Sequence, residues 1–437
     1  MDRTPSRPRA WGPFVPGWPV YAVLLGYWIW WVLGLSGFIW ALAAVPMLAN
    51  LVMRGRVRAP RGFGVWMLFI AWMLASAVKL DTPTRWIGFV YDAGSYVAIG
   101  VWFLYVYNLP SDALPMRRLS IVCTIFFVSV VVGGYLGMLF PNFSFASPLE
   151  RVLPGGLTGD DFVQTLVHPA FAQVQDVLGY EAPRPKAPFL YANEWGGSLA
   201  LLAPFAVLSW SYLRSRAWRV MVIVALLAAV VPAIGSLDRG LWISAAAAAA
   251  YGAVWLAVAG RAKALVALMV LLAVAAAVLL LTPLKDTIEQ RIANPHSNEG
   301  RSYLYEEALA LARSSPLLGH GGPRASTINP NLPPVGTQGH LWRVLVSHGY
   351  PGALLFCLWF IGLFVRTGRR GPSAAFACHL VLLIGLIQMP IYDGLPSHLF
   401  LLALAGAVGL RALHLAQAAR SPGVTAAAER PGVLTAR

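Results

Sequence analysis

The chain has 437 residues, of which 58% are hydrophobic and only 12% charged, so most of it cannot face water and a set of soluble domains is excluded. The net charge of +15 would suit a nucleic-acid partner, but membrane proteins use Lys and Arg to hold their loops in the cytoplasm. Cys123, Cys357 and Cys378 all lie within apolar runs, which argues against a disulfide framework.

Apolar segments recur along the whole chain and predict an all-α polytopic membrane protein with about twelve transmembrane helices. Segment 1–140 holds five spans, 141–189 is a first large outer loop, and 190–282 holds four spans. A second large outer loop, 283–340, precedes the tenth span; 341–414 holds three spans, and 415–437 is a flexible cytoplasmic tail. The spans are expected near 19–35, 37–53, 63–79, 86–107, 119–140, 190–212, 218–235, 240–259, 264–282, 341–365, 374–391 and 397–414.

The distribution of basic residues predicts the orientation. If the N-terminus is cytoplasmic, every predicted inner loop is basic, for example the loops that carry Arg54, Arg117 and Arg214. This pattern satisfies the positive-inside rule and places both termini in the cytoplasm. The high charge therefore indicates topology and contact with anionic lipid headgroups, not a nucleic-acid partner.

Basic residues in the predicted outer loops need another reason. Arg239 and Arg301 are the informative pair, because a guanidinium matches the geometry of phosphate with two parallel hydrogen bonds. An ordinary ion pair with Asp238, or snorkelling to headgroups, is the alternative. Arg184 and Lys186, in a proline-rich stretch, could extend such an anion clamp or be plain loop charges.

The second outer loop also contains a helical stretch, Arg301–Arg313. Its spacing predicts that Tyr303, Ala308 and Leu311 line one face, while Glu306 and Glu307 face water.

Histidine can act as a base near neutral pH, and His340 lies where the second outer loop re-enters the membrane. His320 lies in a glycine-rich turn and His348 lies inside a predicted span. No pair of histidines or cysteines has the spacing of a metal site, so no metal is expected.

Three stretches in the last 250 residues or so resemble the O-antigen ligase/polymerase family of bacterial envelope glycosyltransferases. Asn193 and Glu194 lie in the first stretch, Phe189–Gly196, which resembles the family's Asn-bearing start of a span. The second stretch, Asp238-Arg239-Gly240-Leu241-Trp242, is similar to the family's Ser-Arg-Gly-x-Trp signature. The third runs from Arg301 through Pro316–Gly321 to Gln338-Gly339-His340 and Ser347–Gly352.

The resemblance implies a GT-C-like helical enzyme that acts on the outer face of the bacterial inner membrane without metal, nucleotide sugar or other cofactor. Arg239 and Arg301 match the family's diphosphate-binding arginines. Family ligases carry a His-Asn pair eleven residues before the first Gly of the Gly-x-x-Gly element, and here Gln338 and Gly339 occupy those positions. Either His340, two residues later, replaces the missing base, or Glu194 or Asp393 takes the proton, because Gln cannot be a base at neutral pH.

The expected function is therefore transfer of a glycan from a polyprenyl diphosphate, such as undecaprenyl diphosphate, to a sugar hydroxyl, with inversion. The enzyme would be a polysaccharide polymerase or a ligase of the lipopolysaccharide O-antigen type. Arg239, Arg301 and His340 would be catalytic, and Arg184, Lys186, Asn193, Glu194 and Gln338 would bind substrate.

The alternative from another class is a lipid-linked glycan flippase or exporter. Transporters usually carry internal repeats and ionisable residues at mid-membrane. No repeat is visible, and Asp92 is the main acidic candidate in a span. A non-catalytic assembly subunit would leave the outer arginines unexplained.

Overall fold

The computed structural model describes residues 16–176, 178–281, 284–293, 296–328, 332–368 and 371–420. It is mostly helical, and each of the twelve predicted spans coincides with helical structure. The helices at these positions are α1 (Trp18–Leu25), α2 (Tyr27–Val32), α3 (Ile39–Met53), α4 (Phe63–Ala75) with η1 (Ser76–Lys79), α5 (Pro83–Asn108), α6 (Met116–Leu139), α10 (Ala192–Tyr212), α11 (Arg216–Ala228), α12 (Val230–Gly235), α13 (Arg239–Val258), α14 (Ala262–Leu280), α17 (His340–Thr367), α18 (Ser373–Gln388) and α19 (His398–Arg420).

The apolar helices make the chain an integral membrane protein. Seven described segments are long and apolar enough to cross a bilayer, namely Arg85–Asn108, Met116–Leu139, Arg216–Gly235, Arg239–Val258, Ala262–Leu280, His340–Thr367 and His398–Gln417. Ile39–Met53, Phe63–Lys79 and Ser373–Gln388 are shorter apolar helices. The count of twelve and the GT-C-like assignment stay predictions. Residues 1–15 and 421–437, on which the prediction for the two termini rests, lie outside the described ranges.

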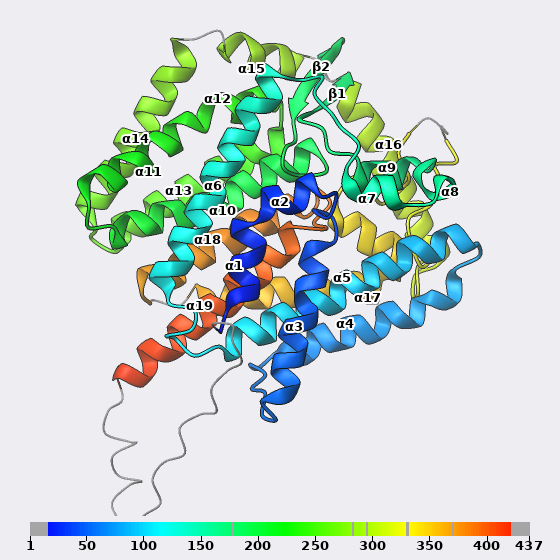
Figure 1. Cartoon of the computed structure of the whole chain (residues 1–437), viewed down its shortest axis with the longest axis horizontal. Helices are drawn as coiled ribbons and strands as arrows, with labels where there is room; N and C mark the ends of the chain where they lie inside the picture. Colours follow the sequence, from blue (N-terminus) through cyan, green and yellow to red (C-terminus); the bar gives the residue numbers. More distant parts are fainter. Residues whose placement is uncertain are drawn as a thin grey trace, which may run out of the picture.

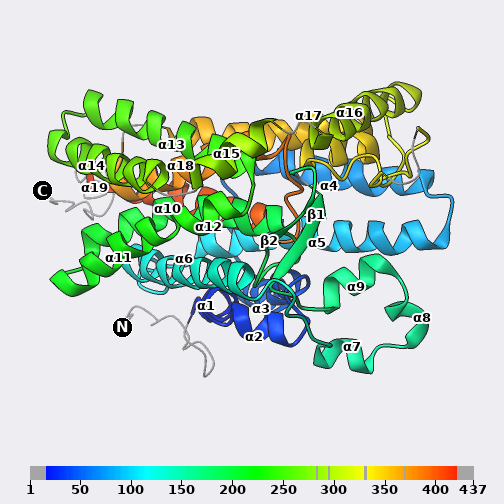
Figure 2. The same ribbon diagram turned by 90° about the horizontal axis from the view of Figure 1, so that it is seen from above.

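The centre of the molecule is formed by α10, which packs against α6, α18 and α13. Helix α19 packs against α18 and α5, and the core contains fully buried Trp40, Trp66, Trp102 and Trp195. The opposite extreme is α14, which lies at one end of the molecule (Figure 2) and has 0% of its span buried. A helix that is apolar all round and unburied by protein suits contact with lipid.

The first large loop departs from the all-α prediction. It contains three short helices, α7 (Pro148–Val152), α8 (Gly155–Thr158) and α9 (Asp161–Val167). A two-stranded antiparallel sheet follows, in which β1 (Ala172–Asp176) pairs with β2 (Glu181–Pro185). The proline-rich strand β2 can join this sheet because the sheet has only two strands. Each strand has a neighbour on one side only, so prolines, which lack an N–H donor, are tolerated on the open side.

The second large loop contains α15 (Leu284–Ala293) and α16 (His296–Ser314) before α17. Ala308 is buried on α16 as predicted, but Tyr303 is 51% exposed and Leu304 is buried instead. Glu307 was expected to face water and is buried, because its carboxylate accepts hydrogen bonds from the main chain and side chains of the 326–327 segment. Both large loops lie on one side of the molecule, away from the C-terminal end of α19 (Figure 1).

The glycine-rich turn of the second loop is locked into a break in α17. Gly349 interrupts the helix with φ 70 and ψ −172, which frees the carbonyls of the preceding turn. The N–H groups of His320 and Gly321 donate to the Val346 and Ser347 carbonyls at 2.9 and 2.8 Å. A Cβ at Gly349 would lie 2.5 Å from the Leu317 carbonyl oxygen, so only Gly fits. This contact fixes the loop against the half of α17 that begins at His340.

Candidate functional site

The start of α17 packs against the loop of residues 389–397, which connects α18 and α19. The His340 N–H donates to the Tyr392 carbonyl at 2.7 Å, and the Leu341 N–H donates to the Met389 carbonyl at 3.0 Å. These hydrogen bonds satisfy N–H groups that the first turn of a helix cannot satisfy itself. The Trp342 indole donates to the Pro390 carbonyl at 3.1 Å. The beginning of α17 is therefore held on this loop at three points.

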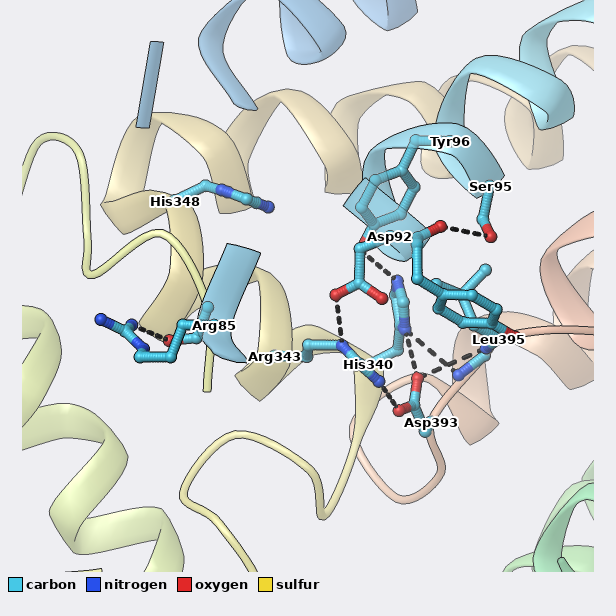
Figure 3. A network of polar contacts seen from close by, with 12 residues as sticks. Arg85, Asp92, Ser95, Tyr96, His340, Arg343, His348, Asp393 and Leu395 are labelled. Carbon is cyan, nitrogen blue, oxygen red and sulfur yellow. Dashed lines mark hydrogen bonds and ion pairs between the residues drawn. The ribbon is translucent and has the colours of Figure 1, made fainter. Parts of the chain in front are cut away.

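A network of polar side chains, which we call the His340 network, joins α5, α17 and the 389–397 loop (Figure 3). His340 Nδ1 lies 2.8 Å from Asp393 Oδ1, and His340 Nε2 lies 2.9 Å from the Tyr96 hydroxyl. Arg343 donates through Nε to Asp92 at 3.0 Å and through a terminal nitrogen to Asp393. Two acids, one Arg, one His and one Tyr thus form a continuous chain of hydrogen bonds.

Asp393 is the most exposed member of this network. Its side chain is 26% exposed, whereas the side chain of His340 is 0% exposed and both ring nitrogens of His340 have partners. Burial alone would raise the pKa of Asp393, but Arg343 and His340 outweigh it and hold the pKa below its usual value. Asp393 is therefore a carboxylate at neutral pH, and it lies between the solvent and His340.

A second group of charged residues surrounds the start of α13, and we call Arg184, Arg239, Arg291, Arg301 and Asp238 the arginine cluster. Arg184 donates through Nε to the Ser236 carbonyl at 2.7 Å, and Arg291 donates through Nε to the Leu237 carbonyl at 3.2 Å. Leu237 has φ 55, a left-handed conformation that costs energy in a residue other than Gly. Two arginines thus hold the strained turn that precedes Arg239.

The charges of the arginine cluster shift one another's pKa values. Burial, together with the charges of Arg239, Arg184 and Arg301, lowers the pKa of Arg291 to about 10. Burial raises the pKa of Asp238 to about 6, although Arg184 and Arg301 oppose the change. Four guanidinium groups around one buried carboxylate make a site that favours an anion.

The arginine cluster and the His340 network share the 389–397 loop. The Leu241 N–H, two residues after Arg239, donates to the Tyr392 hydroxyl at 2.8 Å. On α16, Tyr305 lies one turn after Arg301 and its hydroxyl donates to the Gln338 and Pro390 carbonyls at 3.2 and 3.4 Å. The same ring stacks on Trp342 with the ring centroids 4.6 Å apart. Residues close to Arg239 and Arg301 along the chain therefore contact the same loop that holds His340.

The other predicted substrate-binding residues are partly committed to the protein itself. Arg184 donates to the Asn193 side-chain oxygen at 2.7 Å. Glu194 is 3% exposed and accepts the Leu190 N–H at 3.1 Å. Gln338 is half-buried and offers its main-chain carbonyl to Tyr305. Contact of these residues with substrate stays a prediction.

Lys186, the remaining predicted residue, lies half-buried at the end of β2. Burial lowers its pKa to about 8, although the charge of Glu194 opposes the change. With Ser36, Thr165 and His168 it lines a small cavity of about 10 Å³, room for about one water molecule. Its substrate role also stays a prediction.

The predictions from the sequence missed Arg343 and Arg291, and they gave Asp92 no partner. An Arg three residues after His340, inside an apolar helix, was a usable signal, because a charged residue in a span needs a partner. Asp92 was considered as a transporter acid, and the structure pairs it with Arg343. In the described ranges, no group of three or more His, Cys, Asp or Glu side chains is arranged to hold a metal ion.

Comparison with known families adds a direct match. Residues 233–357 match the family model described as O-antigen ligase. The chain therefore carries an O-antigen ligase domain. No curated protein matches the chain. The matched segment of the ligase domain includes Arg239, Arg291, Arg301, His340 and Arg343, whereas Asp92 and Asp393 lie outside it. The domain indicates an O-antigen-ligase-type membrane glycosyltransferase, as the resemblance predicted.

Proposed function

We propose that this membrane glycosyltransferase transfers a glycan from a polyprenyl diphosphate to a sugar hydroxyl on the outer face of the bacterial inner membrane. The observation that carries the proposal is that Leu241 and Tyr305, which follow Arg239 and Arg301 of the arginine cluster, contact the 389–397 loop that also holds His340. A diphosphate matches four guanidinium groups in charge and geometry. A carboxylate–histidine pair close by suits removal of the proton from an attacking hydroxyl.

The transfer would exchange one bond for another. The acceptor oxygen forms a bond to the anomeric carbon from the face opposite the diphosphate, the bond from that carbon to the diphosphate oxygen breaks, and the configuration inverts. The released polyprenyl diphosphate keeps the electron pair, and Arg239 and Arg301 stabilise this growing negative charge. The proton of the acceptor hydroxyl passes to the His340–Asp393 pair, of which Asp393 is the exposed member.

The residues around the first large loop and the start of α10 would orient the substrates. Asn193, Glu194 and Gln338 would place the sugars, and Arg184 and Lys186 would add positive charge near the donor. The polyprenyl chain would lie along lipid-facing helices, and the acceptor would be a growing glycan in a polymerase or a glycolipid in a ligase. No metal, nucleotide or other cofactor takes part in this scheme.

Purified protein in detergent tests the proposal. Given an undecaprenyl-diphosphate-linked glycan and a matched acceptor, in buffer that contains EDTA and no nucleotide, it should release undecaprenyl diphosphate and form the longer glycan. The matched control is an Arg239→Ala/Arg301→Ala variant, which should be silent. A flippase or exporter would show no turnover in detergent and would move lipid-linked glycan across liposome membranes. That combination, obtained with several donor and acceptor pairs, would contradict the proposal.

A further inference from the structure

Arg343 joins two carboxylates that come from distant parts of the chain (Figure 3). Its Nε donates to Oδ2 of Asp92 on α5, and a terminal nitrogen donates to Oδ2 of Asp393 in the 389–397 loop. The side chains of Arg343 and Asp92 are only 12% and 9% exposed. Because one planar guanidinium serves both acids with different nitrogens, the direction of the Asp393 carboxylate is fixed relative to α5.

The remaining oxygen of Asp393 is thereby left for His340. Oδ1 of Asp393 lies 2.8 Å from Nδ1 of His340 and also accepts the Leu395 N–H at 3.3 Å. The opposite ring nitrogen meets Tyr96, which lies one turn after Asp92 on α5. Helix α5 therefore supports the His340 ring twice, directly through Tyr96 and indirectly through Asp92, Arg343 and Asp393.

Stability alone is a poor reason for this arrangement. Burying charged groups costs desolvation energy, and buried ion pairs can often be replaced by apolar residues without loss of stability. An Arg between two acids in the interior is better explained by the fixed orientation and charge that it gives to the acid beside His340. Arg343 is on the same helix as His340, so both move together with α17.

We propose that Arg343 and Asp92 are positioning residues of the transfer reaction: Asp92 holds Arg343, and Arg343 orients the Asp393 carboxylate so that the His340–Asp393 pair can accept the proton. The inference rests on the proposed function. Neither residue contacts the reacting atoms in this scheme; both act through Asp393.

The surroundings of Asp393 define what its pH dependence would report. Arg343 and His340 face it from α17, and Asp92, Tyr91 and Tyr96 face it from α5. Tyr191 and Glu194 face it from the start of α10, and His398 faces it from α19. Arg343 is the Arg in this set, and the other acids are Asp92 and Glu194. Without Arg343, the charged form of Asp393 loses its strongest support, so Asp393 should take up a proton at a higher pH.

The test uses a variant that removes Arg343 together with the buried Asp92, so that only the partly exposed Asp393 loses its ion-pair partner. Arg343→Gln alone orphans two carboxylates and is expected to lower the yield of folded protein. Asp92→Asn/Arg343→Gln removes one negative and one positive charge and should fold, which its elution volume and unfolding temperature in detergent would show. Its kcat should fall about 100-fold, the lower end for loss of general acid–base catalysis. The donor KM should stay within about threefold of the wild type.

The pH profile separates positioning from a purely structural role. The acid limb of kcat should move up by about one pH unit or more in the double variant. Arg343→Lys should recover only part of kcat, since one ammonium cannot reproduce the fork that reaches both acids. The control is Lys285→Gln/Glu289→Gln, an exposed pair with its charged atoms 3.4 Å apart on α15, which should keep wild-type kinetics.

Two results would overturn the inference. The first is a wild-type kcat in the folded double variant. The second is a loss of activity that is proportional to the loss of folded protein, with the acid limb of the pH profile unchanged. A wild-type enzyme that releases no polyprenyl diphosphate would instead remove the proposed function together with the inference.

Discussion

His340 Nδ1 lies 2.8 Å from Oδ1 of Asp393, although the two residues are 53 positions apart. A carboxylate at this distance orients the imidazole ring and favours the tautomer with its proton on Nδ1. The opposite nitrogen lies 2.9 Å from the Tyr96 hydroxyl, and in this tautomer it accepts the hydrogen bond of that hydroxyl. The match to the ligase domain ends at residue 357, so half of this pair comes from outside the matched segment.

The first prediction concerns the proton acceptor. His340→Ala and Asp393→Asn should each lower kcat by about two to four orders of magnitude, because each breaks the pair that takes the proton. Gln338→Ala should cost less than about fivefold in kcat. The reason is that Tyr305 contacts the main-chain carbonyl of residue 338, which Ala retains. Release of polyprenyl diphosphate in detergent measures all three.

The reverse order would contradict this assignment. If Gln338→Ala is the most damaging change and His340→Ala is nearly silent, the search for a base moves to Glu194, with Glu194→Gln as the next variant. Protonation of Asp393 itself should not limit the wild-type rate above about pH 4. Burial would raise the pKa of Asp393, but Arg343 and His340 outweigh it and hold the pKa below the usual value. Asp393 therefore stays charged, and keeps supporting transfer, until the pH falls below that usual value.

The second prediction concerns the arginine cluster. Arg239→Ala and Arg301→Ala should each lower kcat by about 10²–10³-fold, the usual cost of removing one group that stabilises charge in the transition state. Lys at either position should rescue poorly, because a point charge lacks the two-pronged geometry. Arg313→Ala, on the exposed end of the same helix as Arg301, serves as the control and should be active. Full activity in both cluster variants would remove these arginines from the mechanism.

The third prediction concerns orientation in the membrane. Cysteines introduced at Gly156 and Ser314 are exposed in the two large loops and should react with impermeant reagents from outside. A cysteine at Ser215, exposed between α10 and α11, should react only after permeabilisation. The native thiols Cys123 and Cys378 are buried and Cys357 is partly buried, so the background should be low. Reversed accessibility at any of the three sites would contradict cytoplasmic termini.

The sequence was a good guide to the helices, because hydropathy is a local property, and all the predicted spans are helical. The roles predicted for Arg239, Arg301 and His340 stay predictions. The sequence could not show that Arg343 pairs with Asp92, since 251 positions separate them. Nor could helical spacing show that the 326–327 segment folds back to cover Glu307. Long-range pairing is decided by packing, which no local pattern contains.

Asp238 carries the fourth prediction, since it stands where the family signature has Ser. It is 2% exposed, and its side chain accepts the Leu241 N–H at 3.4 Å as the N-cap of α13. Asp238→Ser keeps a good N-cap but removes the carboxylate from among the arginines. The product polyprenyl diphosphate should then bind about tenfold more tightly, as expected for the loss of one nearby negative charge. Its inhibition constant against transfer is the measurement.

The pH dependence of that constant tests the same idea independently. Burial raises the pKa of Asp238 to about 6, so the carboxylate is protonated below that pH and repels the diphosphate above it. The ratio of the wild-type inhibition constant to that of Asp238→Ser should therefore be near unity at low pH and should rise between about pH 5 and 7. Titration of the diphosphate itself cancels in this ratio. Asp160→Ser, at the N-cap of α9 in the first large loop, is the matched control. A ratio that does not change with pH would show that Asp238 exerts no charge on the bound anion, and its role would reduce to capping α13.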